Sequence, residues 1–207
     1  MNGYGVGGIC LIRFRDLRPR GVPSRFGIGS ENAAHRIAVE WTEGGERRTG
    51  VYVPRRDTNS TSSELLGGRL FPGVHHAASF DVREADDRCG VEMTSDDDET
   101  HVRVRVRGEP PDSLPEDSVF DSLSAASDFF ERMSLGHSPN ERREGYEALE
   151  LHAFEWEVTP LEVASVESSC FGGFPDDLAE FDHALPMRDI EHEWHEREPV
   201  CSGPVAD

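Results

Sequence analysis

Lysine is absent from this sequence of 207 residues, and all 21 of its basic residues are arginines. The chain therefore has no side-chain amine that could form a Schiff base with a carbonyl substrate. Arginine cannot take over this role, because its guanidinium group stays protonated and is not nucleophilic. Catalysis through a lysine nucleophile is excluded.

Long hydrophobic runs and closely spaced cysteines are also lacking. No segment approaches the roughly 18 apolar residues of a membrane-spanning helix, and the first residues do not resemble a signal peptide. The four cysteines include no C-x-x-C pair, so we expect neither a zinc ribbon nor a redox dithiol. We predict a cytoplasmic protein that does not bind a membrane and uses no metal or cofactor.

Acidic residues outnumber basic residues by 41 to 21, which gives a net charge of −20. Such a charge repels the phosphates of nucleic acids, so we do not expect nucleic acid as a partner. The composition resembles that of cytosolic proteins from halophilic archaea, in which surface carboxylates stay hydrated while molar salt screens their repulsion. We therefore predict a folded, halophilic protein with an acidic surface.

Much of the chain alternates between apolar and polar residues, which is the pattern of half-buried β-strands. In residues 101–107, for example, three valines share one face of the expected strand and three arginines share the other. The apolar residues after position 146 change phase near Ala153, which predicts a β-bulge. The expected strands are residues 8–15, 35–41, 50–56, 77–82, 89–93, 101–107, 147–158 and 161–168.

Helical periodicity is confined to two segments. Residues 118–133 carry apolar side chains at helical spacing, and we expect the main helix there. A shorter helix is expected to begin near Glu64, after a turn at residues 57–60, and to end at Pro72. Residues 136–145 are expected to form a polar connection.

About eight short strands, one main helix and no repeated strand–helix–strand rhythm favour a mainly β fold, either a barrel or a sandwich. The length suits one domain, which we place at residues 1–185. Residues 186–207 are charged and are expected to form a flexible tail. The sequence HEWHE in this tail has Glu196 where the motif H-E-x-x-H needs a histidine, so we expect no zinc site there.

Several segments resemble the uncharacterised domain-of-unknown-function branch of the acetoacetate decarboxylase-like superfamily. In chain order they are LIRFRDLRPRGVP, AAHRIAVEW, GVYVPRRDTNS followed by LLGGRLFPGVHH, and DFFERMSLGH. The resemblance covers residues 9 to about 170 and implies a closed antiparallel β-barrel around a small-molecule pocket. The decarboxylase itself uses a lysine, which is missing here, so the resemblance implies the fold and not the reaction.

The resemblance also bears on assembly. Most relatives begin with an additional strand pair that this chain lacks. One edge of the barrel would then be open or covered by a partner, as in a homo-oligomer.

Three arginines are candidate ligand-binding residues. Arg36, Arg55 and Arg56 lie on strands that the resemblance places around the pocket, and a guanidinium fork suits a substrate carboxylate. Neighbouring strand residues point to opposite faces, so one of Arg55 and Arg56 can point inward and the other outward. The alternative is that these arginines pair with carboxylates of the protein itself.

Candidate proton-transfer groups lie in the same part of the chain. His75 and His76 titrate near neutral pH, and only one of them can point inward from a strand. Glu40 and Glu64 are candidate carboxylate partners. The alternative is that the histidines are structural and the carboxylates are solvated.

Two functions of different classes follow from these residues. The first is a protein that binds a small anionic or carbonyl compound without turning it over. The second is a lysine-independent lyase or related enzyme that acts on a small keto or hydroxy acid, with arginine for the carboxylate and histidine or glutamate for proton transfer. Convergence of a histidine, a glutamate and an arginine on one enclosed site would favour the enzyme.

Overall fold

The computed structural model describes residues 3–60, 73–85, 88–140, 145–172, 174–175 and 178–199. The short helix expected near Glu64, and Glu64 itself as a candidate site residue, lie outside these residues. The described part is mainly β, as the alternating sequence predicts.

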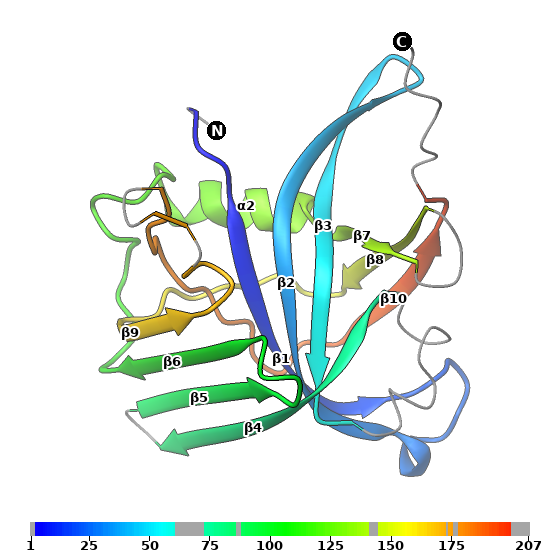
Figure 1. Ribbon diagram of the computed structural model, residues 1–207, viewed down its shortest axis with the longest axis horizontal. Helices are drawn as coiled ribbons and strands as arrows, with labels where there is room; N and C mark the ends of the chain where they lie inside the picture. Colours follow the sequence, from blue (N-terminus) through cyan, green and yellow to red (C-terminus); the bar gives the residue numbers. More distant parts are fainter. Residues whose placement is uncertain are drawn as a thin grey trace.

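Three long antiparallel strands form the centre of the fold (Figure 1). Strand β1 pairs with β2, and β2 pairs with β3 along most of its length. A short 3-10 helix, η1, lies between β1 and β2. The elements are β1 (Gly7–Leu17), η1 (Ser24–Phe26), β2 (Ile28–Glu43) and β3 (Glu46–Thr58).

The second edge of β3 is shared by two different parallel partners. Near its middle, Val51 and Tyr52 pair with β7, and its last three residues pair with β4. Each partner starts an antiparallel wing, and Figure 1 shows the two wings leaving β3 in different directions. The first wing is β4 (His75–Ala85), β5 (Arg88–Ser95), β6 (His101–Arg107) and β9 (Val163–Ser168), and the second is β7 (Leu135–Pro139), β8 (Tyr146–Ala153) and β10 (His192–Arg197).

This branching explains why the predicted closed barrel is wrong. The strand order is β10-β8-β7-β3-β4-β5-β6-β9, with β2 and β1 attached to β3, and no pairing among the described residues closes the order into a ring. In a closed barrel, each strand pairs with one neighbour on each of its two edges, and the last strand pairs with the first. Here β3 divides the sheet instead, and two of the pairings are parallel, so the sheet is not purely antiparallel.

A bulge shapes the middle of the β2–β3 pair. Val53 and Pro54 of β3 lie opposite the single residue Arg36, between the pairs of His35 with Arg55 and of Ile37 with Tyr52. Proline has no N–H to donate to a ladder, so a bulge accommodates it. The strand then continues to Thr58, beyond the start of the turn that the sequence predicted.

The main helix begins later than its sequence pattern predicts. Helix α2 spans Leu123–Arg132, and the side chain of Ser122 accepts a hydrogen bond from the N–H of Ala125. Upstream, Asp182 accepts hydrogen bonds from the hydroxyl of Ser118 at 2.7 Å and from the N–H of Val119 at 2.8 Å. This contact from a distant segment holds residues 118–120 in a non-helical conformation.

Other boundaries also differ from the prediction. Residues Leu135–Pro139 form β7, where a polar connection was expected. Strand β8 ends at Ala153, so the phase change there marks the end of the strand rather than a bulge. Within the segment expected to be a flexible tail, His192–Arg197 form strand β10, which pairs with β8. Both missed strands are short and rich in residues of low β-propensity, and their long-range partners stabilise them.

The two faces of the central strands are covered by different groups. One apolar cluster joins Ala33 to the wing of β4, β5 and β6, with Met93 completely buried. On the other face, Ala34, Val51 and Val53 pack against Met133 at the end of α2. Residues 33 and 34 therefore point to opposite sides of the sheet, as alternation requires.

Candidate functional site

The short ladder between β3 and β4 brings most of the predicted site residues together. Residues paired across a ladder point to the same face of a sheet, and neighbours along a strand point to opposite faces. The ladder therefore sorts the candidates into two groups, one on each face. The pairs are Arg56 with His75, Asp57 with His76, and Thr58 with Ala77.

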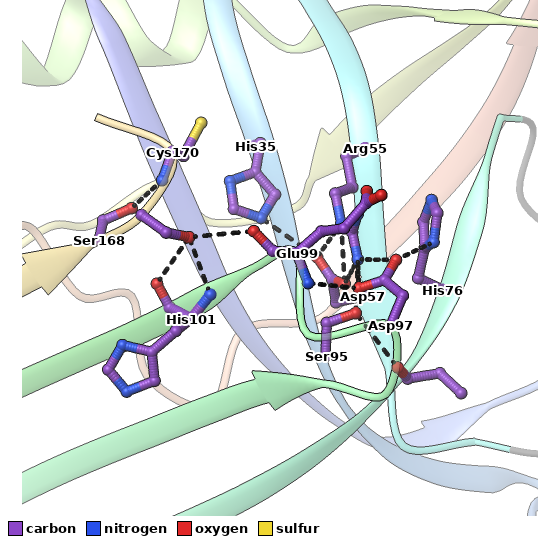
Figure 2. Close-up of polar contacts among 12 residues, drawn as sticks. His35, Arg55, Asp57, His76, Ser95, Asp97, Glu99, His101, Ser168 and Cys170 are labelled. Carbon is purple, nitrogen blue, oxygen red and sulfur yellow. Dashed lines mark hydrogen bonds and ion pairs between the residues drawn. The ribbon is translucent and has the colours of Figure 1, made fainter. Parts of the chain in front are cut away.

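Arg55 is engaged by protein carboxylates on one face (Figure 2). Its Nη2 lies 2.9 Å from Oδ1 of Asp57 and 2.8 Å from Oδ2 of Asp97, and its Nη1 lies 3.2 Å from Oε2 of Glu99. Nη2 also donates to Oγ of Ser95 at 2.5 Å. The donors of Arg55 are used within the protein, which is the alternative that the sequence left open.

Two histidines extend this network. Nε2 of His35 lies 3.1 Å from Oδ2 of Asp57, and Nδ1 of His76 lies 2.9 Å from Oδ2 of Asp97. The side chain of Asp57 is completely buried, and that of His35 is 3% exposed. Figure 2 shows the chain of contacts running from His35 through Asp57, Arg55 and Asp97 to His76. These contacts join β2, β3 and β4 to the turn between β5 and β6.

Charge pairing sets the pKa values in this network. Burial alone raises the pKa of Asp57, but hydrogen bonds from His35 and Arg55 outweigh burial and hold the pKa below its ordinary value. Burial alone lowers the pKa of Arg55, and hydrogen bonds to Asp57 and Asp97 raise it above its ordinary value. Asp57 and Arg55 are therefore both ionised at neutral pH, and we assign this pair a structural role.

Arg56 lies on the opposite face and is half-buried, like Arg55. Its Nη1 donates a hydrogen bond to Oγ of Ser138 at 2.5 Å. A Cβ at Gly73 would lie only 2.6 Å from Nη1 of Arg56, so glycine lets the backbone of residue 73 cover the guanidinium group. Burial and repulsion from Arg36 lower the pKa of Arg56 to about 10, and the carboxylate of Glu147 opposes this shift.

Arg36 shares this face with Arg56. It lies between Ala34 and Ala38 on β2, both of which contact the apolar cluster beneath α2, and Ala34 is also the ladder partner of Arg56. Nε of Arg36 is buried and has no hydrogen-bond partner in the described part of the chain. Two guanidinium groups therefore lie close enough together for the charge of Arg36 to lower the pKa of Arg56.

The remaining candidates lie apart from this pair or outside the described residues. Glu40 forms an ion pair with Arg47 near the β2–β3 hairpin, and its side chain is 52% exposed. His75 is half-buried and is the ladder partner of Arg56. The structure thus places Arg56 and His75 on one face and Arg55 and His76 on the other.

Sequence reasoning missed Ser138, Glu147 and Asp97. Ser138 lies on β7, which has no sequence signal of a strand, and Glu147 is the partner of Ser138 on β8. Asp97 lies in an acidic run that predicts only a turn. The contact between Arg56 and Ser138 could have been predicted only by assigning residues 135–139 to a strand that pairs with β3.

The histidines of β10 do not form a metal site. Three positions apart on a strand, His192 and His195 point to opposite faces. Nε2 of His195 lies 3.4 Å from Oε2 of Glu193. Within the described residues, no group of three or more histidine, cysteine or carboxylate side chains is arranged to bind a metal ion.

His137 is a buried histidine with an unusual environment. It is 6% exposed, its ring packs edge-on against Trp41 with a centroid distance of 4.9 Å, and neither ring nitrogen has a hydrogen-bond partner among the described residues. Burial lowers the pKa of His137, and the negative charge of Glu43 opposes this only in part. The neutral imidazole is the form that fits the fold.

Acid should therefore destabilise the protein through His137. Because the folded-state pKa is lowered, its contribution to stability is fully present above the unfolded-state pKa of about 6.5 and is lost as the pH falls towards the folded-state pKa. We expect a slope of up to about 1.4 kcal/mol per pH unit from this group. Urea unfolding from pH 7 to pH 5 should give a flatter profile for His137→Phe than for the parent.

The matched control is His152→Phe on the neighbouring strand β8. His152 is exposed and its ring packs against Phe154, so this variant removes a histidine without changing the buried one. It should keep the parental slope. Equal slopes for the parent and for His137→Phe would show that another group causes the acid sensitivity.

Comparison with known proteins adds no functional assignment. No family model matches the sequence, and a search of curated proteins finds no match. None of the helices within the described residues has the length and apolar character that crossing a membrane requires. The geometry of the site is therefore the basis for a functional conclusion.

Proposed function

We propose that the protein binds a small anionic compound at Arg36 and Arg56, on the face of the central sheet that packs against α2. The observation that carries this proposal is the buried Nε of Arg36, which has no acceptor among the described residues and lies close to a second, buried guanidinium group. A buried cation is costly unless an anion pairs with it. A ligand carboxylate would supply that charge to Arg36.

The surroundings of the two arginines support a carboxylate rather than a bulkier anion. A planar guanidinium matches a carboxylate through two parallel hydrogen bonds. Ser138 and Gly73 crowd the Nη1 end of Arg56, so the more open part of the site lies beside Arg36. Arg55 is not part of this proposal, because its donors already contact Asp57, Asp97 and Glu99.

Calorimetry with short carboxylic, keto and hydroxy acids in molar potassium chloride tests the proposal. The variant Arg36→Gln should weaken binding by about 1.5–3 kcal/mol, the contribution of a hydrogen bond to a charged group. Arg36 is the best residue to change, because its Nε makes no hydrogen bond to any of the described residues that the substitution would remove.

The matched control is Arg103→Gln. Arg103 lies on β6, and its Nε is also buried without a hydrogen-bond partner among the described residues. Its Nη2 and Nη1, however, pair with Glu92 and Glu167, so its loss should leave the affinity unchanged. Small and equal effects at Arg36 and Arg103 would mean that Arg36 does not contact the bound acid, and the proposed site would be abandoned.

A lysine-independent lyase is the second candidate. One observation favours it: His75 is the ladder partner of Arg56, and Glu147 is close enough to Arg56 for its charge to oppose the lowering of the pKa of Arg56. A histidine, a glutamate and an arginine thus lie near one another, with His75 as the proton-transfer group for a keto or hydroxy acid. Proton NMR of the same acids would detect turnover, and His75→Gln should abolish it while the affinity remains.

We also propose that the chain is a diverged, cytoplasmic member of the acetoacetate decarboxylase-like superfamily from a halophilic archaeon. The order and spacing of the resembling segments support this, and the all-arginine, acidic composition supports a high-salt environment. The lysine-dependent reaction of that superfamily stays excluded. A homo-oligomer that covers a free sheet edge is compatible with the open sheet, and light scattering in molar salt would detect it.

A further inference from the structure

Open space, here called the gap at Gly8, borders Arg36 on the side of β1. The partner of Arg36 on that strand is Gly8, which contributes no side chain. A Cβ at Gly8 would point to the same face as Arg36 and would have no atom within 4 Å. The neighbouring Gly7 faces the other side, where a Cβ would meet the ring of Phe171 at 3.1 Å. The open space is therefore specific to the face that carries Arg36.

The surroundings of this gap are apolar and incompletely covered. Cys10, the next residue of β1 on this face, pairs with Ala34, and Ala38 follows Arg36 on the same face of β2. Cys10, Ala38 and Phe129 of α2 are all half-buried and pack against the cluster of Val51, Val53 and Met133. Small side chains thus leave part of an apolar surface exposed directly beside a cation.

This arrangement selects for a particular class of anion. An inorganic anion or acetate would contact Arg36 and leave the apolar surface in water. A ligand with an alkyl chain would cover that surface as well, and each buried methylene strengthens binding by about fourfold. Long chains gain nothing further once the half-buried residues are covered.

We infer that the ligand of the proposed anion site is a short aliphatic carboxylate, with its carboxylate against Arg36 and its alkyl chain in the gap at Gly8, against Cys10, Ala38 and Phe129. This inference rests on the proposed function and adds the substrate class. The neighbouring Arg56 contributes a second positive charge and favours the ionised form of the acid.

Calorimetry of acetate, butanoate, hexanoate and octanoate at constant salt is the first test. The affinity should rise by about fourfold for each methylene and then level off within the series. Hexanamide has the same chain without the charge, so it should bind much more weakly than hexanoate. Arg36→Gln should weaken all four acids, whereas Ala38→Leu should weaken hexanoate more than acetate because leucine fills part of the gap.

Alkylation provides a second readout that does not depend on these variants. Hexanoate should slow the reaction of Cys10 with iodoacetamide. Mass spectrometry of peptides measures this rate, and Cys170 serves as the internal control in the same samples. Cys170 is exposed in the turn after β9 and should react at an unchanged rate. Equal rates at Cys10 with and without bound hexanoate would show that the alkyl chain of the ligand does not lie against Cys10, and would overturn the inference.

The outcomes separate the two proposals. Acids that bind with equal affinity at every chain length, and lose it in Arg36→Gln, would overturn the aliphatic class and leave the anion site intact. A complete lack of binding, or binding that Arg36→Gln does not change, would overturn the anion site itself. Equal affinity for hexanoate and hexanamide would do the same, because it would show that the charge is not recognised.

Discussion

The variant Asp57→Ala should lose about 3–5 kcal/mol of its free energy of unfolding, the cost of breaking a buried ion pair from one side. The side chain of Asp57 is completely buried and accepts from both Arg55 and His35. Without the carboxylate of Asp57, the side chain of Arg55, which is only 14% exposed, loses its most buried partner. Because small domains are stable by only about 5–15 kcal/mol, this loss would leave the protein close to unfolding.

Urea unfolding of the parent, Asp57→Ala and Asp57→Asn in molar salt measures this effect. Asparagine keeps the shape of aspartate and one acceptor oxygen, so Asp57→Asn should lose less free energy of unfolding than Asp57→Ala. The control is Asp81→Ala, because the pair of Asp81 with Arg83 is exposed to solvent and should contribute little to stability. Equal losses for Asp57→Ala and Asp81→Ala would show that Arg55 and His35 find other acceptors.

The pH dependence of the same variant has a defined sign. The folded-state pKa of Asp57 is lowered, so its contribution is fully present above the unfolded-state value of about 3.9 and is lost as the pH falls towards the folded-state pKa. The difference between the parent and Asp57→Ala should therefore shrink below about pH 4. A difference that stays constant down to pH 3 would argue that packing, rather than the charge of Asp57, is responsible.

At low ionic strength the protein should be largely unfolded, and its melting temperature should rise steeply with potassium chloride. The net charge of −20 creates self-repulsion that salt screens, since the Debye length falls from roughly 30 Å at 0.01 M to roughly 3 Å at 1 M. Far-ultraviolet circular dichroism across salt concentration measures the transition. An unchanged melting temperature would contradict the halophilic interpretation.

A neutral osmolyte separates screening from general stabilisation. Sucrose stabilises folded proteins through exclusion from their surface and does not screen charge. It should therefore leave the protein at low salt less stable than molar potassium chloride does. If sucrose restored the fold as well as salt does, self-repulsion would not be the cause of the instability.

The sequence by itself determined the local features of this protein. Alternation predicted strands at eight places, because a two-residue period is a property of the strand alone. It also predicted that Arg55 and Arg56 point to opposite faces, as do His75 and His76, and the ladder places them so. The absence of lysine excluded a Schiff base without any knowledge of the fold.

Only the tertiary structure decided how these strands are assembled and which of the candidate arginines pairs with carboxylates of the protein. The open sheet follows from the division of β3 between β7 and β4, and a pairing partner leaves no periodic signal in either strand. The start of α2 depends on hydrogen bonds to Asp182, and the guanidinium group of Arg55 pairs with Asp97; both carboxylates are distant in the chain. Burial and charge pairing act through space. Neither the buried Nε of Arg36, which has no partner among the described residues, nor the gap at Gly8 therefore has a counterpart in the order of the residues.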